Sequence, residues 1–166
     1  MRAYGMTDAG RVRNRNQDYI YCSSDPVGGL DNLFLVADGM GGHRAGDYAS
    51  RFLVEGLAEY AGRRQGGTAV QVIKEGIRQI NGELYEVSQT NSALSGMGTT
   101  LVAASVEGGT LYAANVGDSR LYLFRDGWLF QITRDHSYVE ELVARGQMER
   151  YSRDYQQKKN IITRAI

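Results

Sequence analysis

The chain has 166 residues, enough for one domain with a substantial core and too few for two domains of ordinary size. Its 19 basic and 19 acidic residues cancel, so no net charge would draw the protein to nucleic acid or to a membrane surface. The single cysteine excludes an internal disulfide, no apolar run reaches the length of a membrane span, and the N-terminus lacks the apolar core of a signal peptide, so we expect a soluble cytoplasmic protein.

The first 40 residues have the composition of strands. Two segments, DYIYCSS at 18–24 and NLFLVAD at 32–38, predict β-strands, and the second is apolar enough to be buried. The segment between them is rich in Pro, Gly and Asp and predicts a turn, whereas Ala3–Met6 is too short to assign. Cys22 falls within the first strand, and we expect its thiol to be buried rather than reactive.

Two helices are expected next. From Ala45 to Leu57 apolar residues recur at helical spacing, and the GRRQGG segment at 62–67 ends the pattern. A second apolar stripe advances in steps of three and four residues: Val70, Ile73, Ile77, Ile80, Leu84 and Val87. Because charged residues lie off this stripe, it indicates core packing rather than a binding face.

From Gly98 the pattern returns to strands. Four segments predict strands: GTTLVAASV at 98–106, TLYAANV at 110–116, SRLYLFR at 119–125 and WLFQIT at 128–133. The Asp126-Gly127 pair between the last two is a strong hairpin signal. A helix is then expected over 138–146, with Ser137 or Asp135 as its N-cap, and residues 147–160 are polar and loop-like.

Three aspartates stand where the predicted strands begin, end or turn. Asp18 begins a strand, Asp38 ends one, and Asp118 lies in the tight turn NVGDSR. Rigid strands fix where such side chains point, and a cluster of carboxylates without cysteine or several histidines favours a hard cation, Mg²⁺ or Mn²⁺, over zinc. Each aspartate taken alone is more typical of an ordinary turn.

The loop ADGMGGHRAG at 37–46 continues from the second predicted strand and contains one of the two histidines, His43. It lacks the Lys-Ser/Thr of a P-loop and the GxGxxG spacing of a dinucleotide fold, so it could cradle a phosphate, hold a metal or merely turn a corner. Its glycines would let the backbone and a substrate approach closely. His43 alone is typical of a surface loop, and Arg13 alone is typical of a solvated charge, although a guanidinium also binds phosphate well.

Six blocks follow one another along the chain: GRVRNRNQD at 10–18, LVADGMGGHRAG at 35–46, GMGTTLVAA at 96–104, LYAANVGDSRLYLFRDG at 111–127, ITRDHSYVEELVARG at 132–146 and NIITRAI at 160–166. In this order they resemble the metal-dependent serine/threonine protein phosphatases of the PPM class, also called type 2C, and especially their bacterial members. The resemblance implies an α+β fold, a four-layer α-β-β-α sandwich of two antiparallel sheets flanked by helices. Residues 1–166 would form the N-terminal two-thirds of this single domain, and 146–160 would form a flap beside the active site.

The same resemblance implies roles for individual residues. Asp18 and Asp38, with the backbone carbonyl of Gly39, would ligate a centre of two Mg²⁺ or Mn²⁺ ions that activates a hydroxide for attack on phosphorus. Asp118 would help to hold a third, weaker ion. Arg13 would bind the substrate phosphate. His43 matches the loop histidine that bacterial members offer as an acid for the leaving oxygen.

Two departures from the family pattern stand out. Position 17, where Glu is the commoner residue, holds Gln17, so an amide would reach the metal-bound water in its place and metal affinity would be weaker. The family also continues beyond this chain with a further third, which carries two more aspartates of the metal centre. We therefore consider a fragment of a longer phosphatase, a missing third supplied as a separate chain, and a natural truncated relative.

Two functions of different classes are consistent with these observations. The first is metal-dependent hydrolysis of phosphoserine and phosphothreonine in proteins, with a cognate serine/threonine kinase as a partner expected at the level of the family. The second is a truncated, non-catalytic module that keeps the fold and binds or regulates phosphorylated protein through Arg13. Retention of Arg13 and of the three aspartates favours the first, and the truncation favours the second.

Overall fold

The structure is a computed structural model that describes residues 1–41 and 45–166. Its strands are β1 (Asp18–Ser23), β2 (Leu33–Met40), β3 (Gly98–Thr99), β4 (Leu101–Glu107), β5 (Thr110–Val116), β6 (Tyr122–Arg125) and β7 (Trp128–Gln131). Its helices are α1 (Ala45–Arg63), α2 (Ala69–Thr90), the short 3₁₀ helix η1 (Ser92–Leu94), α3 (Tyr138–Ala144) and α4 (Arg153–Lys158). These elements confirm the predicted α+β class.

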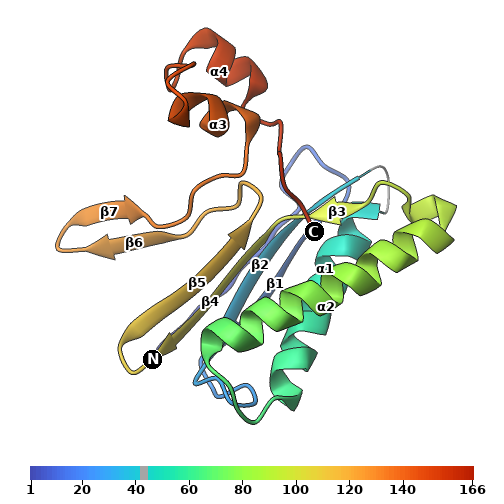
Figure 1. Cartoon of the computed structure of the whole chain (residues 1–166), viewed down its shortest axis with the longest axis vertical. Coiled ribbons are helices and arrows are strands. Elements are labelled where there is room, and N and C mark those ends of the chain that lie inside the picture. Colours follow the sequence, from blue (N-terminus) through green and yellow to red (C-terminus); the bar gives the residue numbers. More distant parts are fainter. Residues whose placement is uncertain (42–44) are drawn as a thin grey trace.

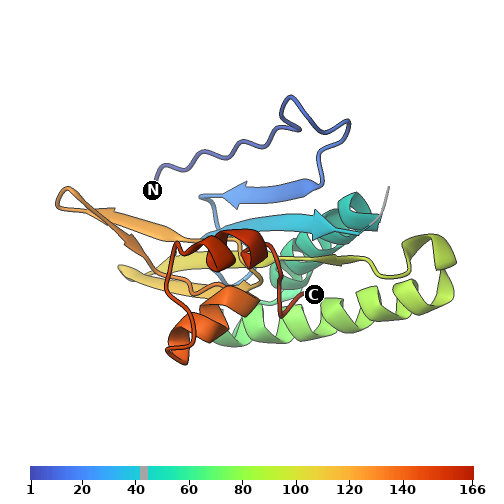
Figure 2. The same cartoon turned by 90° about the horizontal axis from the view of Figure 1, so that it is seen from above.

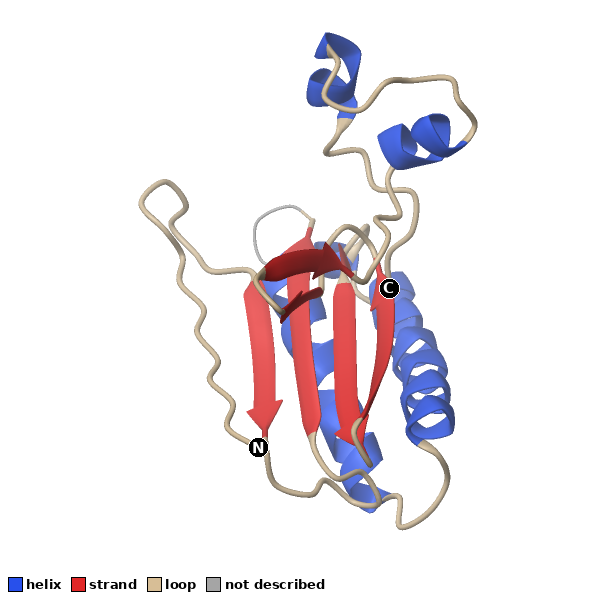
Figure 3. Ribbon diagram, turned by 90° about the vertical axis from the view of Figure 1, so that its left-hand side faces the viewer, coloured by secondary structure: helices blue, strands red, loops and turns tan. Residues whose placement is uncertain are grey.

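The main sheet is antiparallel and has the strand order β1-β2-β4-β5, with β3 paired to the end of β2. Helices α1 and α2 cover one of its faces, and no helix of the described residues covers the opposite face (Figures 1 and 3). Strands β6 and β7 form a separate two-stranded sheet that projects away from the main sheet. The chain therefore shows two antiparallel sheets, the second of which is a single hairpin.

The core lies between the main sheet and the two long helices. In β2 the side chains of Leu33, Leu35 and Ala37 are fully buried on the helix side. Val36, which points to the other face, is 46% exposed. The strand that was predicted to be buried is therefore buried on its helix side and partly exposed on the other, because α1 and α2 cover one face of this sheet.

Helix α2 begins at a capping box, in which Thr68 and Gln71 exchange hydrogen bonds between side chain and backbone. Ile73, Ile80 and Leu84 of the predicted stripe are buried against the core. Val70 is 54% exposed, because the buried face of the helix lies instead over Val72 and its neighbours.

The C-terminal part of the chain forms a small lobe of α3 and α4 at one end of the sheet (Figure 1). The Asp126-Gly127 hairpin is confirmed: both residues have the positive φ, 52° and 82°, that a type I′ turn requires. Ser137 is the N-cap of α3, since its side chain accepts a hydrogen bond from the backbone N–H of Glu140. The loop predicted for 147–160 is wrong in part, because α4 forms within it and buries Tyr155.

The N-terminal segment runs beside β1 (Figure 2). Residues 3–6, which the structure describes, form no strand. Cys22 is exposed, contrary to expectation, because it lies on the face of β1 that no helix covers. Among the described residues no helix is both long and apolar enough to cross a membrane.

Candidate metal and phosphate site

The pairing of β1 with β2 places Asp18 directly opposite Asp38. The N–H of Gly39 donates to the carbonyl of Gln17 at 2.9 Å, so the pair next to it, Asp18 and Asp38, does not exchange hydrogen bonds between β1 and β2. In antiparallel sheets such pairs have the closer Cα atoms and the closer side chains. The register alone therefore brings two carboxylates together at one end of the sheet.

Like charges placed opposite each other destabilise a sheet, and the pKa of Asp38 reflects this. Burial, and then the negative charge of Asp18, raises the pKa of Asp38 above its ordinary value. Asp118 raises this pKa further, and the guanidinium of Arg13 lowers it. The three residues that were predicted to share a site with Asp38 therefore all act on its charge: Asp18, Asp118 and Arg13. A divalent cation between the carboxylates would remove the repulsion that the protein alone leaves in place.

Gly39 lies where β2 crosses the start of α1 at very short range. A Cβ on Gly39 would lie 1.9 Å from the carbonyl oxygen of Gly46 and 2.7 Å from that of Gln17. Both contacts are with backbone atoms, which cannot rotate away. The glycine predicted to leave room for a substrate is thus required for the packing of a strand on a helix.

The backbone of Gln17 links β1 to β2 and to α1 at this end of the sheet. Its carbonyl accepts from the N–H of Gly39 and from the hydroxyl of Ser50 at 2.7 Å. The side-chain amide nitrogen lies beside Gly46, since a Cβ there would meet it at 2.7 Å. In this position the side chain contacts the first turn of α1. A role for Gln17 near the metal stays a prediction.

Asp118 occupies a turn that is fixed by its neighbours on both sides. Gly117 has φ +97°, and it exchanges two hydrogen bonds with His136: its N–H donates to Nδ1 at 3.2 Å, and its carbonyl accepts from the His136 N–H at 2.9 Å. Ser119 shares a hydrogen bond of 2.6 Å with Thr100. Sequence reasoning missed His136 and Thr100, because neither contact is local in the chain.

The donor set suits a hard cation, since it consists of carboxylates and a backbone carbonyl. Asp18 and Asp38 are the two of these donors that the strand register brings together. Over residues 1–41 and 45–166, however, no three Asp, Glu, His or Cys side chains gather in a metal-binding cluster. His43 lies outside the described residues, and its predicted role stays a prediction.

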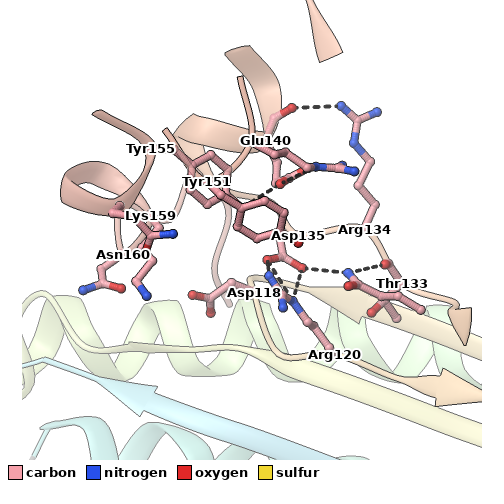
Figure 4. Close-up of a pocket in the computed structure, with 13 residues that line it drawn as sticks. Asp118, Arg120, Thr133, Arg134, Asp135, Glu140, Tyr151, Tyr155, Lys159 and Asn160 are labelled. Atoms are coloured by element: carbon pink, nitrogen blue, oxygen red, sulfur yellow. Dashed lines mark hydrogen bonds and ion pairs between the residues drawn. The ribbon is translucent and has the colours of Figure 1, made fainter. Parts of the chain in front are cut away.

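A cavity of about 670 Å³ opens beside Asp118, between the β6–β7 hairpin and the lobe of α3 and α4 (Figure 4). Two ion pairs line it. Asp135, buried, receives a forked pair of hydrogen bonds from Arg120 at 2.9 and 2.6 Å. Glu140, also buried, accepts from Arg150 at 2.6 Å and from the hydroxyl of Tyr155 at 2.8 Å.

These pairs were not predicted from the sequence, in which Asp135 was considered only as a helix cap. Glu140 joins α3 to the loop before α4 and to α4 itself. The hydrogen bonds from Arg150 lower the pKa of Glu140, and burial with the bond to Glu140 raises the pKa of Tyr155 to about 12. The proposed flap at 146–160 is therefore anchored at one buried carboxylate, while its function stays a prediction.

Replacing Glu140 with glutamine is expected to cost about 1–3 kcal/mol of stability at pH 7, because Arg150 and Tyr155 lose a charged acceptor. The folded-state pKa is depressed, so this stabilisation is present above the unfolded value near 4.5 and is lost as the pH falls through the folded value. Urea unfolding at pH 7 and pH 4 measures both effects. Glu141→Gln, which removes only a long and exposed pair with Arg145, is the control. Equal stability of Glu140→Gln and the wild type at pH 7 would contradict this role.

Comparison with known proteins connects this geometry to a family. The family model described as Protein phosphatase 2C matches residues 4–142. A relative named Serine/threonine phosphatase stp, from Listeria monocytogenes serotype 4b, is 39% identical over the whole of this chain, which covers 67% of that protein. The resemblance inferred from the six sequence blocks is thereby confirmed.

Solved structures agree with the sequence comparison. Serine/threonine phosphatase Stp1 from Staphylococcus aureus superimposes with a TM-score of 0.87 at 36% identity, over 97% of this chain and 64% of that one. The catalytic domain of the serine threonine protein phosphatase PstP, solved with two manganese ions, gives a TM-score of 0.78 at 35% identity, over 95% of this chain and 63% of that one. The chain thus spans about two thirds of the length of these relatives.

Proposed function

Since the chain belongs to the protein phosphatase 2C family, we propose that it carries the metal- and phosphate-binding part of a serine/threonine protein phosphatase. The reaction is hydrolysis of the phosphomonoester on phosphoserine and phosphothreonine side chains of proteins. The observation that carries this proposal is the pair of facing carboxylates, Asp18 and Asp38, in which burial and then the charge of Asp18 raise the pKa of Asp38.

The carboxylates of Asp18 and Asp38 and the carbonyl of Gly39 would hold two Mg²⁺ or Mn²⁺ ions, and Asp118 would contribute to a third. When bound, such ions would supply positive charge that activates water and offsets the charge of the phosphate. The PstP structure with two manganese ions supports this choice of metal. Bound ions would also offset the charge repulsion between Asp18 and Asp38, which would otherwise only destabilise the sheet.

Arg13 is the proposed phosphate ligand. It lies on the exposed loop before β1, close enough to Asp38 for its charge to lower that pKa. A guanidinium can donate two parallel hydrogen bonds to phosphate oxygens, and from this position Arg13 would orient the ester toward the acid pair. His43 is proposed, from the sequence resemblance, to donate the proton that the leaving oxygen needs.

The test is hydrolysis of a phosphothreonine peptide by this chain with Mn²⁺, against the same assay in EDTA and against a phosphotyrosine peptide. We expect turnover that requires Mn²⁺ and prefers phosphothreonine. Arg13→Ala should raise KM by roughly 10-fold or more, because it removes a bidentate phosphate contact. Arg11→Ala, on the same exposed loop, is the control and should leave KM unchanged. Turnover that persists in EDTA would contradict the metal assignment.

One observation favours the alternative of a non-catalytic module. The described residues supply two facing carboxylates but no cluster of three. Binding of the phosphothreonine peptide without turnover, at any Mn²⁺ concentration, is the result that this alternative predicts. A cognate serine/threonine kinase remains a prediction from the resemblance, and a cytoplasmic location remains a prediction from the sequence.

A further inference from the structure

Thr100 lies between β3 and β4 and is completely buried. Its backbone N–H donates to the carbonyl of Asp38 at 2.9 Å, and its hydroxyl accepts from the N–H of Asp38, also at 2.9 Å. Both backbone groups of Asp38 are therefore held by one residue. The hydroxyl of Thr99 also donates to the Asp38 carbonyl, at 3.1 Å. Since the backbone groups of Asp38 do not pair with those of Asp18, Thr100 is the residue that holds both of them.

The same hydroxyl reaches the turn that carries Asp118. Thr100 Oγ1 lies 2.6 Å from the hydroxyl of Ser119, the residue after Asp118. On the other side of that turn, a Cβ on Gly117 would lie 2.6 Å from the methyl group of Thr100. The turn therefore packs against Thr100 both before and after Asp118.

Threonine is suited to this position because it uses both branches of its side chain. The hydroxyl links the N–H of Asp38 to Ser119, and the methyl group packs against the backbone of Gly117. Valine would keep the methyl contact and lose both hydrogen bonds. Serine would keep the hydrogen bonds and lose the methyl contact.

We propose that Thr100 is a positioning residue that sets Asp38 and Asp118 relative to each other, so that both carboxylates face one divalent-cation centre. This inference rests on the proposed function, because it assumes that the two aspartates bind metal. It adds that the spacing of the two carboxylates is set through one shared hydroxyl and not independently by β2 and by the turn that carries Asp118. Partners that orient metal ligands in this way typically change metal affinity by roughly 10- to 100-fold when they are lost.

The experiment is calorimetric titration of Mn²⁺ into the wild type, Thr100→Val, Thr100→Ser and Ser119→Ala, with melting in EDTA measured for each. Ser119→Ala keeps the bond between Thr100 and the Asp38 N–H but removes the link to the Asp118 turn, so it tests the coupling even where Thr100→Val folds poorly. Ser105→Ala is the control, because Ser105 on β4 is also fully buried and, among the described residues, its hydroxyl bonds only to Glu107.

We expect Thr100→Val to bind Mn²⁺ roughly 10-fold or more weakly, and Ser119→Ala to show a loss in the same direction. Thr100→Ser should remain within about 3-fold of the wild type, since it keeps both hydrogen bonds. Ser105→Ala should bind as the wild type does, whatever its melting temperature in EDTA. A purely structural hydroxyl would change that melting temperature and leave Mn²⁺ affinity unaltered.

Amide hydrogen exchange gives a second readout that needs no metal. The N–H of Asp38 should exchange faster in Thr100→Val than in Thr100→Ser, because valine removes its acceptor. Wild-type affinity in both Thr100→Val and Ser119→Ala would overturn the inference while leaving the proposed function intact. Failure of the wild type itself to bind Mn²⁺ would instead overturn the metal assignment, and the inference with it.

Discussion

Replacing Asp38 with asparagine should abolish Mn²⁺-dependent turnover and, at the same time, make the metal-free protein more stable. The loss of turnover should be about 10³-fold or more, because under the proposed function Asp38 is a charged metal ligand worth several kcal/mol to the transition state. The gain in stability follows from the raised pKa of Asp38, which shows that burial and the charge of Asp18 disfavour its ionised form.

The sign of the stability change depends on pH. A raised folded-state pKa favours folding only below the unfolded value near 3.8, and that contribution is lost as the pH rises through the folded value. Above the folded value the wild type therefore has a charged carboxylate opposite Asp18, and Asp38→Asn removes this repulsion. The melting temperature in EDTA should rise by about 2–4 °C per kcal/mol gained, and this gain should vanish in acid.

Melting in EDTA and turnover with Mn²⁺ are measured on the same preparations. Asp31→Asn is the matched control, since Asp31 lies in an exposed turn and does not face another acid across the sheet. It should change neither quantity. A lower melting temperature for Asp38→Asn, or full turnover, would show that the acid pair is an ordinary structural feature.

Replacing Gly39 with alanine should reduce the stability of the protein by about 3 kcal/mol or more, near the upper end of what overpacking costs. The added Cβ would meet the carbonyl oxygens of Gly46 and Gln17, so β2 and α1 would have to separate. Their separation would also displace the Gly39 carbonyl from the acid pair. We therefore expect weaker Mn²⁺ binding together with a melting temperature about 6–12 °C lower.

Gly82→Ala is the matched control for this change. Gly82 lies in α2 with no atom of the described residues within 4 Å of a Cβ placed on it. Alanine there should stabilise the helix by about 0.5–1 kcal/mol, because glycine loses more backbone entropy on folding. Urea unfolding distinguishes the two variants. If Gly39→Ala were as stable as the wild type, the close approach of β2 and α1 would not constrain the site.

Most elements of the fold could be predicted because their signals are local. The apolar run of β2, the stripe of α2 and the Asp126-Gly127 turn each depend on residues that are neighbours in sequence. The exposure of Cys22 and Val36 could not be predicted in this way. It depends on which face of the sheet the helices cover, and that is a tertiary property.

In the candidate site, too, residues with a local signal could be predicted, and residues that depend on tertiary contacts could not. Asp18 and Asp38 were predicted from their places at strand ends, and the register then placed them opposite each other. Thr100 and Glu140 were not, since their partners lie 62 residues and 10 to 15 residues away and neither is distinguished by local composition. The need for glycine at position 39 was predicted, but for a different reason. A Cβ there would meet the backbone of α1 and would not point into space left for a substrate.

The most direct test is to locate manganese in crystals of this chain grown with saturating Mn²⁺, by anomalous diffraction at the manganese edge. The proposed function predicts a strong anomalous peak between the carboxylates of Asp18 and Asp38, about 2.1 Å from their oxygens, the distance at which small hard cations bind. The peak should disappear in Asp38→Asn. Manganese bound only elsewhere, or no peak within bonding distance of either carboxylate, would contradict the assignment of this pair as a metal centre.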